Sequence, residues 1–453
     1  MKKALVIFGS TGNLMYKKLI PAIYHLYQKN HIDQDFKIYA ITRHDETLET
    51  YIEHAKENVS TYIDWNLIEG MMVYVHFDVH NIDDYRQLKN RIHADGYEDI
   101  SLYLAVPPKL FPVIAKGVSQ SKLIQKNEPN KRIVFEKPFG EDLKSAQDIN
   151  RELWQCFNES QIYRIDHYLG KEMIQNIMVV RFSNIVFEQS WNQKAVRSIT
   201  ILSKEEEGIM SRGGYYDKIG ASKDMLQSHL LQMVALVLMD TPKDFSSESI
   251  KDEKVKVFKS LVFNQENLIF GQYKGYKGAE KVEKTSNTET FVYAKAFMNN
   301  QRWKNVPIHF LTGKKLNEKR SEIIIHFKDG HDLGGFFPKK NKQENKLIIK
   351  VSPQEGVEFK FSVKEPGLTN NIQPAILDYC HNCKSMENSP EAYERLLLEL
   401  IQNQRTLFTR WDEIEETWQL IAKIKSDKPP IIYKNYQDLI ERIDDKDVDK
   451  DDL

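Results

Sequence analysis

One short stretch of the chain combines residue types that suit phosphate binding and proton transfer. It reads Arg164-Ile165-Asp166-His167-Tyr168-Leu169-Gly170-Lys171-Glu172. If this stretch enters a helix, His167 and Lys171 are four residues apart and share a face, which predicts a cationic clamp for a phosphate group. Asp166 is then rotated by about 100° from His167 and can point to a different partner. The alternative interpretation is a solvated helix face with an Asp–Lys ion pair.

A second candidate for chemistry is a glycine-containing turn near the N-terminus. Gly9-Ser10-Thr11-Gly12-Asn13-Leu14 follows the apolar run Ala4–Phe8 and precedes a helical pattern. Two glycines let the backbone turn tightly and approach a pyrophosphate, and the helix N-terminus offers free amides. Because the full G-x-G-x-x-G spacing is absent, a plain structural turn is the alternative. Its place at the opening of a βαβ unit favours nucleotide binding.

The end of the second apolar run bears on the choice between the two nicotinamide coenzymes. It reads Ile41-Thr42-Arg43-His44. An arginine at this position suits the 2′-phosphate of NADP, whereas an acidic residue binds the ribose hydroxyls of NAD. Arg43 therefore predicts NADP, and Asp45, two residues further on, leaves NAD possible. The alternative is that Arg43 is a surface arginine without a ligand.

The elements that must position these residues alternate in the first third of the chain. Such alternation predicts parallel strands joined by right-handed crossovers. We expect strands at 4–8, 36–41, 71–75, 102–106 and 133–135, with helices at 14–28, 46–58, 81–92 and 110–120.

The pattern changes after about residue 165, where several segments alternate apolar and polar residues. This periodicity predicts an antiparallel sheet with one covered face. We expect helices at 169–182 and 214–239, and strands at 196–202, 255–263, 266–273, 290–298, 306–311, 321–327, 346–351 and 356–363. Two further helices are expected, one opening at Ser389-Pro390 and one at 412–426, and the charge-dense tail 444–453 is expected to lack order.

The chain resembles the glucose-6-phosphate dehydrogenase family over most of its length. The stretch 164–172 is similar to the family signature, and other family landmarks follow in the same order. They are Gly9–Leu14 with Lys17-Lys18-Leu19-Ile20-Pro21, Tyr103-Leu104-Ala105-Val106-Pro107-Pro108, Glu136-Lys137-Pro138-Phe139-Gly140, Arg212-Gly213-Gly214-Tyr215-Tyr216-Asp217, Gln227-Ser228-His229-Leu230-Leu231-Gln232-Met233, Thr288-Glu289-Thr290-Phe291-Val292, Arg302-Trp303, Gly313-Lys314-Lys315-Leu316-Asn317-Glu318 and Pro390-Glu391-Ala392-Tyr393-Glu394-Arg395-Leu396.

The resemblance implies oxidation of glucose 6-phosphate at C1 to 6-phosphoglucono-1,5-lactone, the first step of the oxidative pentose phosphate pathway. It places the catalytic base at His229 and the carboxylate that orients this base at Asp166. Histidine suits proton removal near neutral pH, and a carboxylate on its other ring nitrogen fixes the tautomer. Judged alone, His229 fits better as a core histidine on a helix with an apolar face, and the resemblance reverses this preference.

The resemblance also implies the remaining binding residues. Asp224 and His229 are five apart, about 140° around an α-helix, so they are not stacked. Glu205 begins an acidic run, so its alignment with the family position could be off by one residue. For the segment from Lys314 to Lys319, the alternative interpretation is a charged surface loop. The implied substrate contacts are Lys137, His167, Tyr168, Lys171, Glu205, Asp224, Lys314 and Lys319, and the implied coenzyme contacts are Gly9, Ser10, Thr11, Gly12, Asn13, Leu14, Arg43, Asp78, Val79, Tyr103, Pro107 and Lys137.

The implied fold is α/β plus α+β, with a Rossmann-like NADP-binding domain at 1–165 and a larger domain with a mostly antiparallel sheet at 166–443, followed by the tail 444–453. The chain departs from the family pattern at Asn13, where the family has aspartate, and at His44. Another Rossmann sugar oxidoreductase or a catalytically silent coenzyme-binding paralogue are the alternatives. The presence of both Asp166 and His229 favours an active enzyme.

Composition limits the other possibilities. With 64 basic and 65 acidic residues the net charge is −1, which predicts no general attraction to nucleic acid or to a membrane surface. The three cysteines indicate a reducing compartment, so we expect a cytoplasmic protein. Cys380 and Cys383 form one C-x-x-C, but a tetrahedral zinc site needs two more ligands, so no metal is expected. A large sheet often supplies a subunit interface, and a homodimer or homotetramer is expected.

Overall fold

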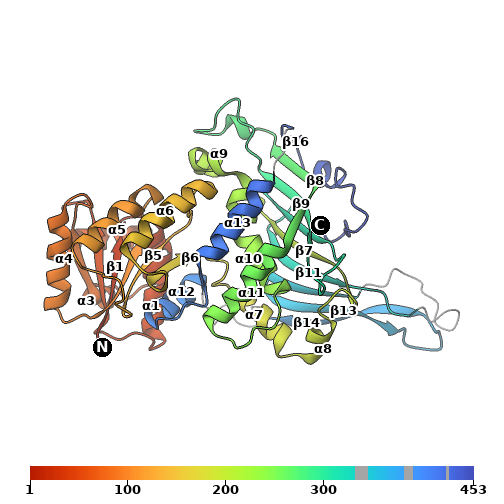
Figure 1. Ribbon diagram of the computed structural model, residues 1–453, viewed down its shortest axis with the longest axis horizontal. Coiled ribbons are helices and arrows are strands. Elements are labelled where there is room, and N and C mark those ends of the chain that lie inside the picture. Colours follow the sequence, from red (N-terminus) through yellow and green to blue (C-terminus); the bar gives the residue numbers. More distant parts are fainter. Residues whose placement is uncertain (332–344, 382–390, 425–427) are drawn as a thin grey trace. The chain divides into compact units, whose positions relative to one another are not determined.

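A computed structural model describes residues 1–331, 345–381, 391–424 and 428–453, and its chain divides into two compact units (Figure 1). The first unit contains residues 1–170, 245–251 and 390–415, and the second contains 171–244, 252–389 and 416–453. Neither unit is therefore one continuous stretch of sequence. Among the described residues, no helix combines the length and apolar character needed to cross a bilayer.

The first unit is built on a seven-stranded sheet whose central strands are buried on both faces. Its order is β15-β6-β5-β4-β1-β2-β3, in which all neighbours are parallel except the β15–β6 pair. Continuous apolar runs such as Leu5-Val6-Ile7 explain this burial, because both faces are covered. The strands are β1 (Lys3–Phe8), β2 (Lys37–Thr42), β3 (Met72–His76), β4 (Asp99–Leu104), β5 (Lys131–Phe135), β6 (Ile162–Ile165) and β15 (Phe408–Thr409).

Helices connect these strands, and α5 and α6 lie side by side in Figure 1. Capping residues mark several starts, such as Thr47, Asn81 and Asp142, whose side chains accept bonds from first-turn amides. The helices are η1 (Met15–Leu19), α1 (Ile20–Gln28), α2 (Leu48–Asn58), α3 (Trp65–Met71), α4 (Ile82–Ala94), η2 (Pro108–Leu110), α5 (Phe111–Gln120), α6 (Leu143–Cys156), η3 (Glu159–Gln161) and α12 (Ala392–Ile401). The expected alternation of strands and helices is confirmed.

The second unit contains a nine-stranded sheet that is mostly antiparallel, as expected. Its order is β14-β13-β12-β11-β7-β10-β9-β8-β16, and only the β7–β10 and β8–β16 pairs are parallel. The strands are β7 (Val196–Lys204), β8 (Leu261–Tyr273), β9 (Phe291–Met298), β10 (Ile308–Gly313), β11 (Arg320–Phe327), β12 (Lys346–Ser352), β13 (Gly356–Lys364), β14 (Ile372–Cys380) and β16 (Ile431–Tyr433).

Helices α7 and η5 of the second unit contact its sheet, and two described helices have residues in both units. The second-unit helices are α7 (Glu172–Phe182), α8 (Ile185–Ser190), η4 (Met210–Arg212), α9 (Gly213–Ala221), η5 (Ser222–Leu230), α10 (Leu231–Leu238), η6 (Tyr276–Gly278) and α14 (Gln437–Ile440). The two helices divided between the units are α11 (Ser247–Ser260) and α13 (Trp411–Lys423).

One expected strand was wrong, and one expected helix start cannot be compared with the structure. The segment 255–263, expected as a strand, belongs mainly to helix α11, which continues to Ser260. Its alternating valines at 255 and 257 imitate a strand pattern, yet Val255, Val257 and Phe258 are all buried on the helix. The Ser389-Pro390 helix start lies outside the described residues, and α12 begins with a capping box at Glu391.

The tail 444–453, expected to lack order, instead packs against the second sheet. Its ends carry buried residues, among them Asp445, Asp452 and Leu453. Lys295 Nζ lies 3.0 Å from Asp445 Oδ1, and Lys346 Nζ lies 2.6 Å from Asp452 Oδ1. Charge density predicts disorder only when the charges have no partners, and here lysines from distant strands supply them.

Candidate functional site

The carboxyl edge of the first sheet brings together most of the residues expected to bind a coenzyme. β1 and β4 are neighbours while the chain continues from β1 to β2 on the other side, so the strand order reverses between β1 and β4. Ligands of open α/β sheets bind at such switch points. Gly9 follows β1 here with φ +82°, and a Cβ on it would lie 2.4 Å from the Ala105 carbonyl oxygen after β4. Only glycine fits this position.

Hydrogen bonds hold the glycine loop in place. Gly12 N donates to Gly9 O at 3.1 Å, which closes the turn. Ser10 Oγ donates to Ile41 O at 2.9 Å, and Tyr51 Oη donates to Ser10 O at 2.9 Å. The loop is therefore tied to β2 and to α2.

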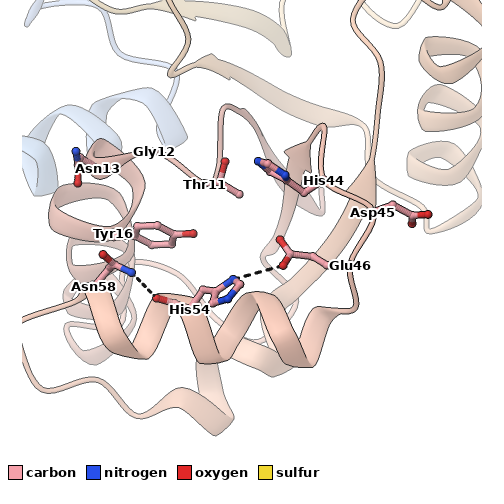
Figure 2. A pocket seen from close by; sticks show the side chains of 9 residues that line it. All are labelled: Thr11, Gly12, Asn13, Tyr16, His44, Asp45, Glu46, His54 and Asn58. Atoms are coloured by element: carbon pink, nitrogen blue, oxygen red, sulfur yellow. Dashed lines mark hydrogen bonds and ion pairs between the residues drawn. The ribbon is translucent and has the colours of Figure 1, made fainter.

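A pocket of about 640 Å³ opens beside this loop (Figure 2). The glycine loop and η1 form one wall, and the end of β2 with α2 forms the other. Arg43, expected to select NADP, is exposed directly before His44. The residues that line the pocket are Thr11, Gly12, Asn13, Tyr16, His44, Asp45, Glu46, His54 and Asn58.

The other expected coenzyme contacts follow neighbouring strands at the same edge. Asp78 and Val79 come after β3, and Val79 O accepts a hydrogen bond from Tyr85 Oη at 2.9 Å. Pro107 precedes the short helix η2 after β4. Tyr103 lies in β4 itself, and its hydroxyl donates inward to the Glu136 carboxylate.

The Glu136 carboxylate lies at the end of β5. No role at the site was expected for this residue from the sequence. It accepts hydrogen bonds from Tyr103 and, at 3.2 Å, from Tyr393 Oη on α12. Burial raises the pKa of Glu136, although the two tyrosine hydroxyls oppose the rise. Glu136 thus links α12 to the sheet edge and fixes the start of the segment that carries Lys137. Its place beside Lys137 in the Glu-Lys-Pro motif was the available signal.

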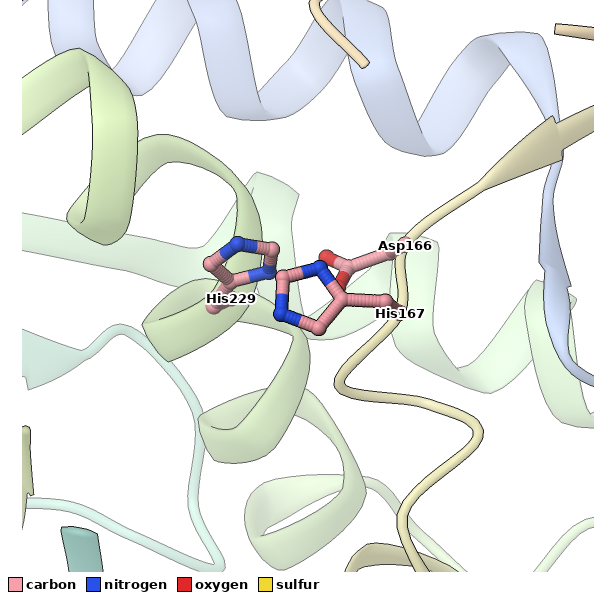
Figure 3. Close-up of side chains that lie close together, drawn as sticks. All are labelled: Asp166, His167 and His229. Atoms are coloured by element: carbon pink, nitrogen blue, oxygen red, sulfur yellow. The ribbon is translucent and has the colours of Figure 1, made fainter. Parts of the chain in front are cut away.

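The signature stretch begins at the end of β6 and does not have the expected conformation. Residues 167–170 form a turn, and α7 begins only at Glu172 with Lys171 as its N-cap. The prediction that His167 and Lys171 share a helix face is therefore wrong. Asp166 Oδ1 accepts a bond from Tyr168 N at 3.0 Å, which stabilises the turn in place of a helix. Figure 3 shows Asp166 and His167 leaving this segment.

His229 and Asp224 lie on η5, a π-helix in the second unit (Figure 3 for His229). Both side chains are buried. In a π-helix the backbone bonds run from i to i+5, so residues five apart lie on one face. The angle of about 140° expected for an α-helix is therefore wrong for this pair. π-Helices are rare, and their presence in proteins is often associated with a functional site.

A break in the backbone directly precedes η5. Gly220 has φ +70° and ψ 174°, and a Cβ on it would lie 2.5 Å from Glu289 Oε1. The same carboxylate accepts from Ser222 N at 3.1 Å. Burial raises the pKa of Glu289, opposed by these hydrogen bonds. Glu289 therefore fixes the start of the helix that carries the expected base.

Two expected sugar-binding residues meet in the second unit. β7 and β10 are parallel, with Lys204 opposite Gly313, so the residues that follow them come side by side. Lys314 Nζ donates to Glu205 Oε2 at 2.6 Å and lies 5.2 Å from the centre of the Tyr216 ring. The pKa of Tyr216 is raised well above its ordinary value, first by burial and then by the Asp224 carboxylate. By contrast, Lys319 is exposed.

One further group of the second unit has ligand types that suit a metal. Donor atoms of His326, Asp449 and Asp452 lie within 4.8 Å of one another. However, Lys346 already neutralises Asp452 at 2.6 Å, and Arg197 Nη2 lies 3.5 Å from His326 Nδ1. A metal ligand histidine usually donates its other nitrogen to an acceptor, not to a cation, so this cluster is a poor metal site.

Comparison with known proteins identifies the chain. A family model described as the NAD binding domain of glucose-6-phosphate dehydrogenase matches residues 6–176, and one for its C-terminal domain matches residues 178–440. The chain belongs to the glucose-6-phosphate dehydrogenase family. Glucose-6-phosphate 1-dehydrogenase of Bacillus subtilis is 38% identical over 445 residues, covering 93% of this chain and 91% of that protein. The enzyme of Borreliella burgdorferi is 38% identical over 450 residues, covering 95% and 93%.

Solved structures of the same family share the fold. A glucose-6-phosphate dehydrogenase in complex with its substrate glucose-6-phosphate matches with a TM-score of 0.91 and 30% identity, over 99% of this chain and 98% of that one. A glucose-6-phosphate 1-dehydrogenase from Mycobacterium avium matches with a TM-score of 0.85 and 32% identity, over 96% and 94%. The family resemblance, the oxidoreductase class and the fold expected from the sequence are thereby confirmed.

Membership in the glucose-6-phosphate dehydrogenase family leaves the individual residue roles as predictions. Asp166 and His167 belong to the first compact unit, and Lys171 and His229 to the second. The pairing of Asp166 with His229, and a phosphate site that combines His167 with Lys171, therefore remain expectations.

Proposed function

We propose that this chain is a glucose-6-phosphate dehydrogenase that oxidises glucose 6-phosphate at C1 to 6-phosphoglucono-1,5-lactone, with NADP as the preferred coenzyme and NAD as a second one. The observation that carries the proposal is the similarity to the substrate-bound structure, which extends over 99% of this chain at a TM-score of 0.91. The reaction would be the first step of the oxidative pentose phosphate pathway.

In this reaction His229 acts as the general base. Its imidazole removes the proton from the C1 hydroxyl while the C1–H bond breaks, which leaves the carbonyl of the lactone. A nicotinamide coenzyme, when bound, would supply the acceptor for the hydride that leaves C1. Asp166 is assigned as the carboxylate that orients this base, a role that fixes the tautomer and stabilises the imidazolium that forms. Burial of both side chains, with 2% and 4% of their surfaces exposed, supports these roles because it keeps competing water away.

The remaining assigned residues hold the sugar phosphate. His167, Tyr168 and Lys171 bind the phosphate group, and the backbone turn supports a site built from a loop and a helix start. The sugar hydroxyls and the space toward the coenzyme are assigned to Lys137, Glu205, Asp224, Lys314 and Lys319. The Lys314–Glu205 contact of 2.6 Å supports a polar sub-site that offers both a donor and an acceptor.

The first unit has the features that a dinucleotide requires. Gly9 gives close backbone approach, the helical segment from Asn13 presents its amino end, and the pocket beside it has room for an adenosine moiety. The residues assigned to the coenzyme are those of the glycine loop, Arg43, Asp78, Val79, Tyr103, Pro107 and Lys137. We assign the coenzyme to residues 1–165 and the sugar to 166–443, in a cytoplasmic homodimer or homotetramer.

Turnover of glucose 6-phosphate with NADP or NAD, followed by the absorbance of the reduced nicotinamide, tests the activity. His229→Asn should lower kcat by roughly 10²–10⁴ with little change in KM, since a general base contributes about that much. His80→Asn, at an exposed histidine, is the matched control and should keep wild-type turnover. Wild-type protein that reduces neither coenzyme contradicts the function, and near-normal turnover of His229→Asn contradicts the assigned base.

Two substitutions test the binding assignments. Lys171→Ala should weaken use of glucose 6-phosphate far more than use of unphosphorylated glucose, because only the former presents a dianion to the ammonium group. Equal losses for both sugars would remove Lys171 from the phosphate site. Arg43→Ala should reduce NADP use more than NAD use, and an unchanged preference would exclude Arg43 as the selector.

A further inference from the structure

The loop between β2 and α2 carries a carboxylate, that of Glu46, which the coenzyme assignment above does not use. We propose that Glu46 is a specificity-determining residue, which weakens binding of NADP and thereby allows NAD to serve as a coenzyme. This inference rests on the proposed function and concerns the same coenzyme site. It assigns to Glu46 a role opposed to that of Arg43.

Two contacts from different elements fix the Glu46 side chain. Its Oε1 accepts a hydrogen bond from Tyr74 Oη on β3 at 3.2 Å, and its Oε2 lies 3.4 Å from His54 Nδ1 on α2. The Tyr74 hydroxyl also reaches His44 O at 2.6 Å, which ties the same loop to β3. The carboxylate is only partly exposed, and Figure 2 shows it on the pocket wall with its bond to His54. The Glu46 carboxylate is therefore held in a defined position on the wall of the pocket.

The charges around the pocket are mixed, which does not suit a phosphate dianion. Asp45 and Glu46 line it together with the imidazoles of His44 and His54. The pKa of Tyr16 on η1 is raised by burial and, to a smaller extent, by the Glu46 carboxylate. The negative field of Glu46 therefore extends to the opposite wall of the pocket. An anion between the glycine loop and α2 thus meets this field.

The chemistry of the two coenzymes differs at one group, the ribose 2′-position. A carboxylate at the end of the second strand accepts hydrogen bonds from the ribose hydroxyls of NAD. A phosphate at this position offers few or no hydrogens and carries a charge of about −1.5 to −2, so the same carboxylate repels it. In addition, the pairing of His54 Nδ1 with Glu46 makes that ring nitrogen unavailable to a phosphate. Both effects favour NAD relative to the preference that Arg43 alone would give.

Glu46→Gln tests the proposal because it removes the charge and keeps an acceptor for Tyr74. We expect kcat/KM for NADP, divided by that for NAD, to rise about tenfold, which corresponds to ~1.4 kcal/mol. The affinity for 2′,5′-ADP relative to 5′-AMP, measured by calorimetry without sugar, should rise by a similar factor. Glu49→Gln is the matched control, since Glu49 is an exposed glutamate of α2 that does not line the pocket.

A ratio in Glu46→Gln within twofold of wild type, or equal to that of Glu49→Gln, overturns the proposal. Tyr74→Phe provides a second variant, which frees the carboxylate without removing it and should raise the same ratio by a smaller factor. The double variant Glu46→Gln/His54→Ala should lose part of the gain, and full retention of the gain overturns the part assigned to His54. Wild-type protein that binds neither nucleotide fragment instead contradicts the proposed function.

Discussion

Acid should destabilise the second unit. The magnitude of this effect can be worked out from the buried histidine His309 on β10. The imidazole is fully buried, with Nδ1 2.9 Å from Tyr293 Oη and 3.8 Å from Asp445 Oδ2. Burial lowers the pKa of His309 to about 4, although the Asp445 carboxylate opposes the shift and Lys295 adds to it. In the unfolded chain the pKa of histidine is about 6.5.

The sign follows from proton counting. Between pH 6.5 and 4 the unfolded chain binds a proton at His309 that the folded chain does not, so stability falls as pH falls through this window. Each pKa unit corresponds to about 1.4 kcal/mol, which gives a total loss of roughly 3 kcal/mol at pH 4. Above pH 6.5 the contribution is fully present and pH-independent. His326, whose pKa burial also lowers to about 4 against the Asp452 carboxylate, adds a loss in the same direction.

The assay is hydrogen exchange of the segment 444–453, corrected for intrinsic rates, at several pH values between 7.5 and 4.5. Wild-type protection should fall steeply below pH 6.5. His309→Asn keeps an acceptor near the position of Nδ1 but does not titrate, so its protection should fall less steeply. The exposed-site control His80→Asn should keep the wild-type slope. Equal slopes in wild type and His309→Asn, or protection that increases on acidification, would refute the reasoning.

Three further predictions concern the fold and the sugar site. Gly9→Ala should lower the Tm more than Gly12→Ala, because only Gly9 has a positive φ and a carbonyl oxygen 2.4 Å from the added Cβ, and calorimetry compares the two. Arg132→Met should cost roughly 3–5 kcal/mol in denaturant unfolding, because it leaves the Asp99 carboxylate buried without its guanidinium, and Arg132→Met/Asp99→Leu should recover part of the loss. Glu205→Gln should raise KM for glucose 6-phosphate several-fold and change kcat less, and unchanged steady-state kinetics would contradict the assigned sugar contact.

Five strands of the first sheet were predictable from the sequence because their signals are local, whereas β6 and β15 were not expected. Apolar runs such as Ala4–Phe8 are strands buried on both faces, and the glycine turn after this run is where the sequence places it. Parallel strands then bring their carboxyl ends to one edge, which explains how residues as distant as Gly9 and Asp166 end on the same side of one sheet. Residue types and strand order were sufficient for the glycine loop, but the short strand β6, which leads to Asp166, was not expected.

Apart from the strand expected at 255–263, where a local valine pattern misled, the errors occurred where a distant residue decides the local conformation. Gly170 lies so close to the first residue of α12 that a Cβ on it would be 2.5 Å from Ala392 O, and a turn replaces the expected helix there. The π-helix at 222–230 starts from a break that Glu289 supports, and neither feature has a periodic signal in the sequence. The tail 444–453 is ordered by lysines that lie about 100 or more residues earlier.

The contrast between local sequence signals and contacts from distant residues also explains why the first unit is not a continuous stretch of chain. Glu136 at the end of β5 is a buried carboxylate, and one of its two tyrosine partners, Tyr393, comes from α12 near the end of the sequence. Glu394 on the same helix lies 2.7 Å from His25 Nδ1 and 2.8 Å from Lys29 Nζ, so α12 is also held to α1. Without α12 these groups of the N-terminal segment would lose their partners. Strand–helix alternation can locate the coenzyme fold in the sequence, but the buried charges determine which distant helix completes it.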